Sequence, residues 1–156
     1  MTLAVTLQRY LADRDIEYDV VRHEPTTSSS QTAQASHIPG DFLAKAVVVK
    51  DEDHFMVAVL PASYHIQLRE LSRLLDRPVG LATEEEASEL FADCERGAFP
   101  AIGTAYGLDV IVEDSLAEQP DLYIEGGDHA SLVHLKAAQF RKLVENARYG
   151  KFGLHD

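Results

Sequence analysis

Lys45 is a residue whose chemistry differs from that of its neighbours. It lies in an apolar run, residues 44–49, whose β-branched composition is typical of a strand. A lysine in such a run must extend its ammonium to solvent, find a partner or face a pocket, because an unpaired buried charge is costly. Lys45 is therefore a candidate site residue, and a strand lysine that points to solvent is the alternative.

The segment 97–103 is a candidate for binding a reacting group through its backbone. The backbone of this segment can follow an unusual path, because Pro100 fixes its own φ whereas Gly97 and Gly103 allow a wide range of φ. Such a loop can direct amide N–H groups toward a carbonyl or a water molecule. The alternative is a plain connecting loop.

A third candidate is the stretch Gly126-Gly127-Asp128-His129, which lies between two predicted strands. Paired glycines allow a bulge or the close approach of a ligand, and His129 would then stand at the rim of a pocket. A tight hairpin with an exposed histidine is the alternative.

Other catalytic and metal-binding patterns are missing from the sequence. It has no GxGxxG, Walker A, HExxH, GxSxG or EF-hand motif. His129 and His134 are five residues apart beside Asp128, which is not a standard ligand spacing, so we expect neither a metal nor a cofactor. Cys94 is the only cysteine, so no intrachain disulfide can form, and we expect a structural thiol.

The order of the predicted helices and strands around these residues indicates an α+β fold with a mixed, curved sheet surrounded by helices. A chain of 156 residues suits one domain over residues 1–156. Ser28 and Thr83 have the spacing of helix caps. Hydrophobic periodicity predicts helices over 3–13, after 28, over 68–75, 84–91 and 140–147, and strands over 17–23, 44–50, 55–60, 108–112, 122–125 and 132–135, with a turn at 51–53.

The charge of the chain is strongly acidic, with 26 acidic and 14 basic side chains and a net charge of -12. Residues 97–135 hold no lysine or arginine but seven acids. Contact with a nucleic acid would therefore be local, and the basic C-terminal stretch, with Lys136, Arg141, Lys142, Arg148 and Lys151, is a candidate unless it is only a solvated helix face. With no apolar run of membrane length and no leader pattern in residues 1–10, we expect a cytoplasmic protein.

The order of these motifs resembles the YbaK family, also called the prolyl-tRNA-synthetase-associated domain. The resemblance covers nearly the whole chain, and each piece of it is weak alone. The matching pieces are His23-Glu24-Pro25-Thr26-Thr27, Ile38-Pro39-Gly40, Ala44-Lys45, Gly97-x-x-Pro100-x-x-Gly103 and Gly126-Gly127-x-His129.

The resemblance implies a strongly curved, barrel-like sheet and the hydrolysis of the ester between a wrong, small amino acid and tRNA, such as alanine or cysteine on proline tRNA. It implies that the catalytic residues are Lys45, Gly97 and Pro100, with Lys45 holding a phosphate or ester oxygen as a cation. Substrate binding would involve the remaining motif residues His23, Gly103, Gly127 and His129.

The implied partner is the acceptor end of an aminoacyl-tRNA, with prolyl-tRNA synthetase or another synthetase as a candidate protein partner and no membrane. Two alternatives stay open. One is a non-catalytic module of this fold that binds tRNA or a synthetase, and the other is a hydrolase of another small ester.

Overall fold

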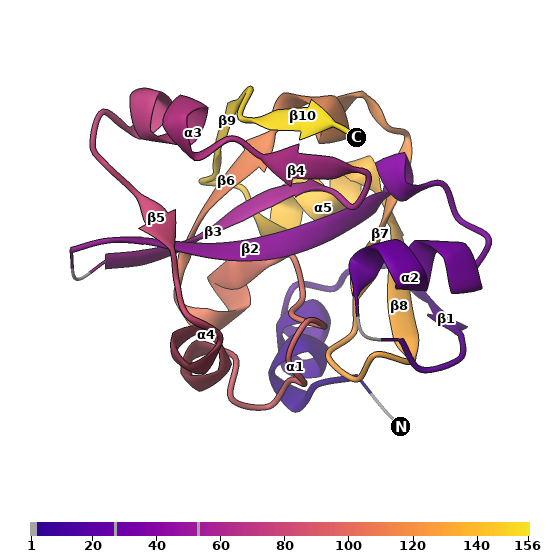
Figure 1. The fold of residues 1–156 in the computed structure, drawn as a ribbon. Coiled ribbons are helices and arrows are strands. Elements are labelled where there is room, and N and C mark those ends of the chain that lie inside the picture. Colours follow the sequence, from indigo (N-terminus) through magenta and orange to yellow (C-terminus); the bar gives the residue numbers. More distant parts are fainter. Residues whose placement is uncertain (1–2, 27, 53) are drawn as a thin grey trace.

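A mixed β-sheet forms the centre of the computed structural model, which describes residues 3–26, 28–52 and 54–156. Thr27 of the first motif and Asp53 of the predicted turn lie outside the described residues. The strands of this sheet run in the order β1-β8-β7-β2-β3-β6-β9, with β5 pairing separately to β2 (Figure 1). They are β1 (Asp19–Arg22), β2 (Leu43–Asp51), β3 (His54–Pro61), β5 (Gly80–Leu81), β6 (Asp109–Glu113), β7 (Asp121–Glu125), β8 (Ser131–Lys136) and β9 (Arg148–Gly150).

The remaining elements surround this sheet. A small ribbon pairs β4 (Tyr64–Ile66) with β10 (Gly153–His155). The α-helices are α1 (Val5–Asp13), α2 (Ser29–Ala35), α3 (Leu68–Leu75), α4 (Glu84–Leu90) and α5 (Ala137–Leu143). The 3-10 helices are η1 (Gly40–Phe42), η2 (Gly103–Tyr106) and η3 (Asp114–Glu118). The α+β class with a mixed sheet is therefore confirmed.

The hairpin of β2 and β3 lies in the middle of the sheet. Its strands are antiparallel from Ala44↔Pro61 to Asp51↔His54. On either side the hairpin has a parallel neighbour, β7 beside β2 and β6 beside β3. This combination makes the sheet mixed, because each parallel neighbour returns to the sheet through a long connection.

Both faces of the hairpin are buried, as its apolar run predicts. Alternate residues such as Val48 and Val57 join one core with α1, α4 and α5. The intervening residues, such as Val49 and Leu60, join a second core with α3 and Phe152. In Figure 1, α1 and α4 accordingly lie on one side of β2 and α3 on the other.

The predicted helix starts follow from side-chain capping. Thr83 and Glu86 form a reciprocal capping box at the start of α4, and Ser28 accepts a hydrogen bond from the backbone N–H of Gln31 at the start of α2. Both contacts are local in sequence, which explains why the spacing alone predicted them.

The end of the chain differs from the prediction. The last helix ends at Leu143 rather than near Ala147, because Val144 leaves helical geometry while its side chain stays buried. The chain then forms β9 and β10, which were not predicted. Strands of two or three residues, such as these and β4 and β5, are too short to show a period of two in the sequence.

Candidate active site

An opening in the pairing of β2 is the feature around which the candidate residues lie. One edge of β2 pairs with β7 at Leu43 and Ala44 and with β5 at Val49 and Lys50. Between these positions no described strand pairs with this edge. Val48 accepts a hydrogen bond there from the N–H of Ala82, so strand alternation directs the N–H and C=O of Ala46 to the same opening.

A groove of about 240 Å³ lies along this opening, and Gly97 lies in its wall. Its lining is mostly apolar and comes from residues 46–48 of β2, from residues 81–84 and 87, and from Arg96, Gly97 and Phe99. Gly97 is exposed and has a φ of 81°, a left-handed conformation that favours glycine. The backbone of Gly97 is thus open to a small ligand in the groove.

His129 joins the second glycine-containing loop to the Gly97 loop. Its Nε2 lies within hydrogen-bond distance of the carbonyl oxygen of Arg96, the residue before Gly97. The N–H of Glu95 also donates to the carbonyl of Gly127 at 2.8 Å. In Figure 1 the segment after α4 and the loop between β7 and β8 accordingly lie together beside α1.

The backbone around His129 requires special conformations. His129 has a φ of 60°, and Gly127 has a φ of 99°. A Cβ atom on Gly127 would lie 2.9 Å from the Cβ of Ala4 and 3.1 Å from the Sγ of Cys94. Gly127 therefore permits the close packing of its loop against Ala4 and Cys94.

Lys45 lies on the other face of β2 from Ala46, because successive strand side chains alternate. Its half-buried ammonium donates a hydrogen bond to the carbonyl oxygen of Tyr64. Burial lowers the pKa of Lys45, while the nearby carboxylate of Asp156 raises it. The ammonium thus lies against β4 and not in the apolar groove.

A comparison with protein families gives a match over most of the chain. The family described as the aminoacyl-tRNA editing domain matches residues 23–143. The chain belongs to this family. The matched segment contains the unpaired part of β2, the Gly97 loop and the loop of His129.

Solved structures show the same fold as this editing domain. A proposed trans-editing enzyme for prolyl-tRNA synthetase has a TM-score of 0.84 at 22% identity, over 97% of this chain and 96% of that one. A hypothetical protein has a TM-score of 0.84 at 17% identity, over 96% and 99% of the two chains. A proposed signal transduction protein from Marinobacter aquaeolei VT8 has a TM-score of 0.78 at 19% identity, over 97% of this chain but 31% of that one. No curated protein shows significant similarity to the chain.

Other predicted residues of the editing domain lie near the groove or beneath it. His23 lies beside the second loop, where its N–H donates to the carbonyl of Ala130 at 2.9 Å. Pro100 is buried behind Gly97. Gly103 is buried in η2, where a Cβ atom would lie 2.5 Å from Cγ2 of Val57. The structure thus brings the loop of Gly127 and His129 against the segment before Gly97, with His23 beside the first of these, and places Gly103 in the core packing.

Glu125 is a residue of this region that the sequence analysis missed. It ends β7, is only 1% exposed, and accepts a hydrogen bond from the hydroxyl of Ser29 at 3.1 Å. Burial raises its pKa to about 7. An acid at the end of the apolar run 122–124, directly before two glycines, was the available signal.

The thiol and the histidines of the editing domain offer no other catalytic centre. Burial raises the pKa of Cys94 to about 12, so the sulfur stays a thiol at neutral pH and is a poor nucleophile. Among the described residues, no group of three or more His, Cys, Asp and Glu side chains could hold a metal ion. Within the same residues, no helix has the length and apolarity to cross a membrane.

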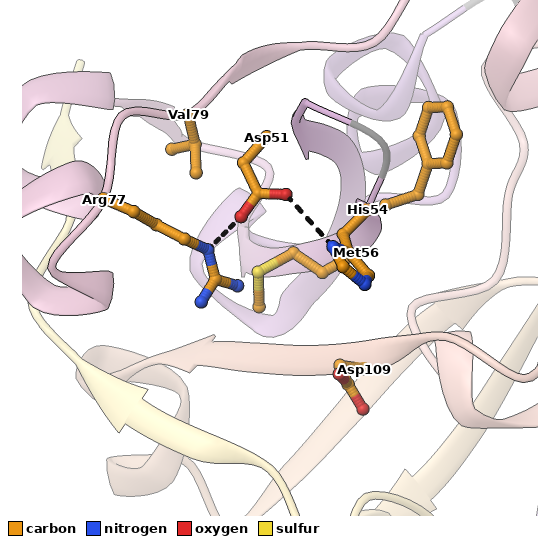
Figure 2. A pocket seen from close by; sticks show the side chains of 7 residues that line it. Asp51, His54, Met56, Arg77, Val79 and Asp109 are labelled. Atoms are coloured by element: carbon orange, nitrogen blue, oxygen red, sulfur yellow. Dashed lines mark ion pairs between the residues drawn. The ribbon is translucent and has the colours of Figure 1, made fainter.

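A larger pocket of about 450 Å³ lies at the far end of the hairpin (Figure 2). Asp51, Arg77 and His54 line it, and the Asp51 carboxylate forms ion pairs with both of the other side chains. Asp109 also lines this pocket, but none of the predicted site residues does. Volume alone therefore does not identify the site.

Proposed function

We propose that the chain is a trans-editing aminoacyl-tRNA deacylase that removes a small amino acid, such as alanine or cysteine, from proline tRNA. The observation that carries this proposal is the contact of His129 with the Gly97 loop at the open edge of β2, in a chain of the editing-domain family. The fold shared with a proposed trans-editing enzyme for prolyl-tRNA synthetase supports the choice of proline tRNA.

The reaction needs little from the protein beyond positioning, because an aminoacyl ester is already activated. Water attacks the ester carbonyl, a new C–O bond forms, and the carbonyl oxygen becomes an oxyanion. The oxyanion then collapses, the bond to the ribose oxygen breaks, and the proton from water passes to that oxygen. Backbone N–H groups of the Gly97 loop, and the N–H of Ala46, are suited to hold the carbonyl and the water.

Lys45 acts in this proposal as a cation and not as a general base. Its ammonium would bind the terminal phosphate or the ester oxygen of the tRNA at the side of the opening. The neighbouring Asp156 favours the charged form and so opposes the effect of burial. The partner of this reaction is the acceptor end of tRNA, delivered free or by a synthetase.

The groove explains why a small amino acid would be the substrate. Its walls are formed by small or apolar side chains, including Ala46, Ala87 and Phe99. A synthetase pocket rejects a side chain that is one methylene smaller by only about 1–3 kcal/mol, so small amino acids are misactivated. A second, smaller site removes them and excludes the larger cognate amino acid by its size.

A non-catalytic module that binds tRNA or a synthetase is the second candidate. It is favoured by the stretch 97–135, which forms much of the site and carries seven acids and no lysine or arginine. Such a stretch repels phosphates, so tRNA would be held weakly or be delivered by a protein.

A deacylation panel tests the proposal. Purified protein would be mixed with proline tRNA charged with alanine, cysteine, serine or proline, and ester loss would be measured against the uncatalysed rate. We expect turnover of alanyl or cysteinyl tRNA and little turnover of prolyl tRNA. Tight binding without hydrolysis of any charged tRNA would overturn the proposal in favour of the binding module.

A further inference from the structure

An ion pair joins two of the segments that line the candidate groove. Nη1 of Arg96 lies 3.4 Å from Oε2 of Glu84, and both residues line the groove. Of the described residues in this lining, Glu84 is the one with a carboxylate and Arg96 is the one with a cation. The protein without substrate therefore pairs the two charges of its groove with each other.

The backbone that presents Glu84 is fixed by local and tertiary contacts. Glu84 is the first residue of α4, directly after Thr83, which forms the capping box with Glu86. The carboxylate of Glu86 also pairs with Lys50 of β2 at 2.8 Å. The start of α4 is thus tied to the strand whose residues 46–48 line the groove.

The backbone that presents Arg96 is fixed from the other glycine-containing loop. The N–H of Glu95 donates to the carbonyl of Gly127 at 2.8 Å, and Nε2 of His129 lies within hydrogen-bond distance of the carbonyl oxygen of Arg96. Arg96 also directly precedes residues 97–135, which hold no lysine or arginine. It therefore supplies a cation beside the Gly97 backbone, in a region that would otherwise repel phosphates.

The ion pair remains accessible and is easily opened. The side chains of Arg96 and Glu84 are 54% and 81% exposed. An ion pair as exposed as this contributes little to stability, because water screens it and two long side chains lose freedom to form it. A ligand that offers both a cation and an anion can therefore replace it at little cost.

An aminoacyl ester of tRNA offers both of these charges. Its α-ammonium is on the carbon next to the ester carbonyl, and the phosphate of the terminal nucleotide lies on the other side of the ribose. If the Gly97 backbone holds the carbonyl, the ammonium also lies at the groove. An ammonium in a mostly apolar groove needs a partner, since a desolvated charge without one is costly.

We propose that Glu84 and Arg96 recognise the substrate by exchanging partners: Glu84 binds its α-ammonium, and Arg96 binds the phosphate of the terminal nucleotide. This inference rests on the proposed function, because it assigns the substrate contacts of the same groove. The phosphate contact of Arg96 leaves the ester oxygen to Lys45. The site then selects esters of amino acids with a free α-amine over esters without that charge.

The first test compares alanyl and lactyl esters of proline tRNA. The lactyl group has nearly the size of the alanyl group but carries a hydroxyl in place of the ammonium. We expect the ratio of kcat/KM for the alanyl ester to kcat/KM for the lactyl ester to fall about 5-fold in Glu84→Gln. The different intrinsic reactivity of the two esters cancels, because the ratio is compared between proteins.

Glu85→Gln is the matched control. Glu85 is also exposed and also lies in the first turn of α4, but it does not line the groove. This variant should keep the wild-type ratio. A wild-type ratio in Glu84→Gln as well would overturn the inference.

The second test measures binding and needs no hydrolysis. The probes are adenosine 5′-phosphate that carries alanine on its ribose through a stable amide, and the same compound without the phosphate. Calorimetry with the full chain should show that Glu84→Gln binds both probes about 5-fold more weakly than the wild type. Equal affinities of these two proteins, or no binding by either, would contradict the proposed contact.

Arg96→Gln gives the signature of an exchange. It should bind the phosphate-containing probe a few-fold more weakly, because it lacks the cation. It should bind the phosphate-free probe a few-fold more tightly, because Glu84 no longer has a competing partner. A loss of affinity for both probes would mean that Arg96 only supports the groove and would overturn the exchange.

The two tests distinguish the failure of this inference from the failure of the proposed function. Hydrolysis of charged tRNA that does not depend on Glu84 overturns this inference alone. The expected pattern of probe binding without hydrolysis of any charged tRNA overturns the proposed deacylase and leaves the ion exchange as a property of a binding module.

Discussion

Two glutamates in this molecule have the same burial and the same place in a strand but different surroundings. Glu113 ends β6 and Glu125 ends β7, and their side chains are 4% and 1% exposed. Oε2 of Glu113 accepts the N–H groups of Phe152 and Gly153, both at 2.8 Å, and Oε1 accepts the N–H of Ser115 at 3.3 Å. Oε2 of Glu125 accepts the hydroxyl of Ser29 at 3.1 Å, and Oε1 has no hydrogen-bond partner among the described residues.

The difference separates a buried acid whose oxygens the backbone satisfies from a buried acid with one unsatisfied oxygen. Glu113 accepts backbone N–H groups and so fixes the turn before β10. Glu125 directly precedes the glycine-containing loop of His129, and burial raises its pKa to about 7. The following predictions test this contrast, from the largest expected effect to the smallest.

Lys45→Ala should remove most of the editing activity and leave the fold intact. The substitution deletes the ammonium that would bind the phosphate or ester oxygen of the tRNA. Removal of such a charge-stabilising group costs about 100-fold or more in kcat. Lys50→Ala is the control, since Lys50 lies on the same strand but pairs with Glu86. Deacylation of Lys45→Ala at the wild-type rate would show that the site assignment is wrong.

Glu113→Ala should destabilise the protein without a specific effect on the site. Three backbone N–H groups lose their acceptor, and a buried unsatisfied donor costs about 1–3 kcal/mol. Urea denaturation would measure the loss, and kcat per folded molecule should stay close to the wild-type value. A stable Glu113→Ala protein would contradict the structural role of Glu113.

Glu125 should make the stability of the protein decrease as the pH rises. Its folded pKa of about 7 lies above the ordinary value of 4.5, so the folded state holds more protons than the unfolded state between these values. Stability is then highest below pH 4.5 and declines up to pH 7, by at most about 3 kcal/mol.

Denaturation of wild type and Glu125→Gln at pH 5 and pH 8 measures this contribution. The variant should lack it and gain relative stability at pH 8, whereas Glu113→Gln should show no such gain. A wild-type pH dependence in Glu125→Gln would show that the carboxyl group titrates normally in the fold.

Gly97→Ala tests whether the backbone of the Gly97 loop takes part in the reaction. Alanine at a φ of 81° strains the backbone by about 1–2 kcal/mol, and the displaced loop should lower kcat about 10-fold. Gly107→Ala is the control, because Gly107 has a similar φ of 75° and an open surrounding. Equal kcat values for the two variants would make the Gly97 loop a simple connector.

Charge reversal of Arg141, Lys142 and Lys151 should have the smallest effect and act on binding alone. All three side chains are exposed, and each phosphate contact adds about one unit to the salt dependence of tRNA binding. We expect KM for charged tRNA to rise a few-fold with little change in kcat, measured at two salt concentrations. An unchanged KM would assign these residues to a solvated surface.

Local sequence determined a large part of this fold. The hairpin of β2 and β3, the capping box at Thr83 and the strands 109–113 and 121–125 follow from runs and spacings within a few residues. These features of the fold were predictable because their causes lie in neighbouring residues. The assignment of Lys45, Gly97 and His129 to the site also rests on short motifs, and it stays a prediction.

Tertiary structure alone decided which candidate residues lie close together and which buried acids have their oxygens satisfied. The unpaired edge of β2 exists because β7 pairs with one end of the strand and β5 with the other, and these partners are far from β2 in sequence. Glu113 and Glu125 look alike in the sequence, each at the end of an apolar run. They differ because Glu113 accepts backbone N–H groups from residues 152 and 153, whereas Glu125 accepts the hydroxyl of Ser29. Only the folded chain brings such distant partners together.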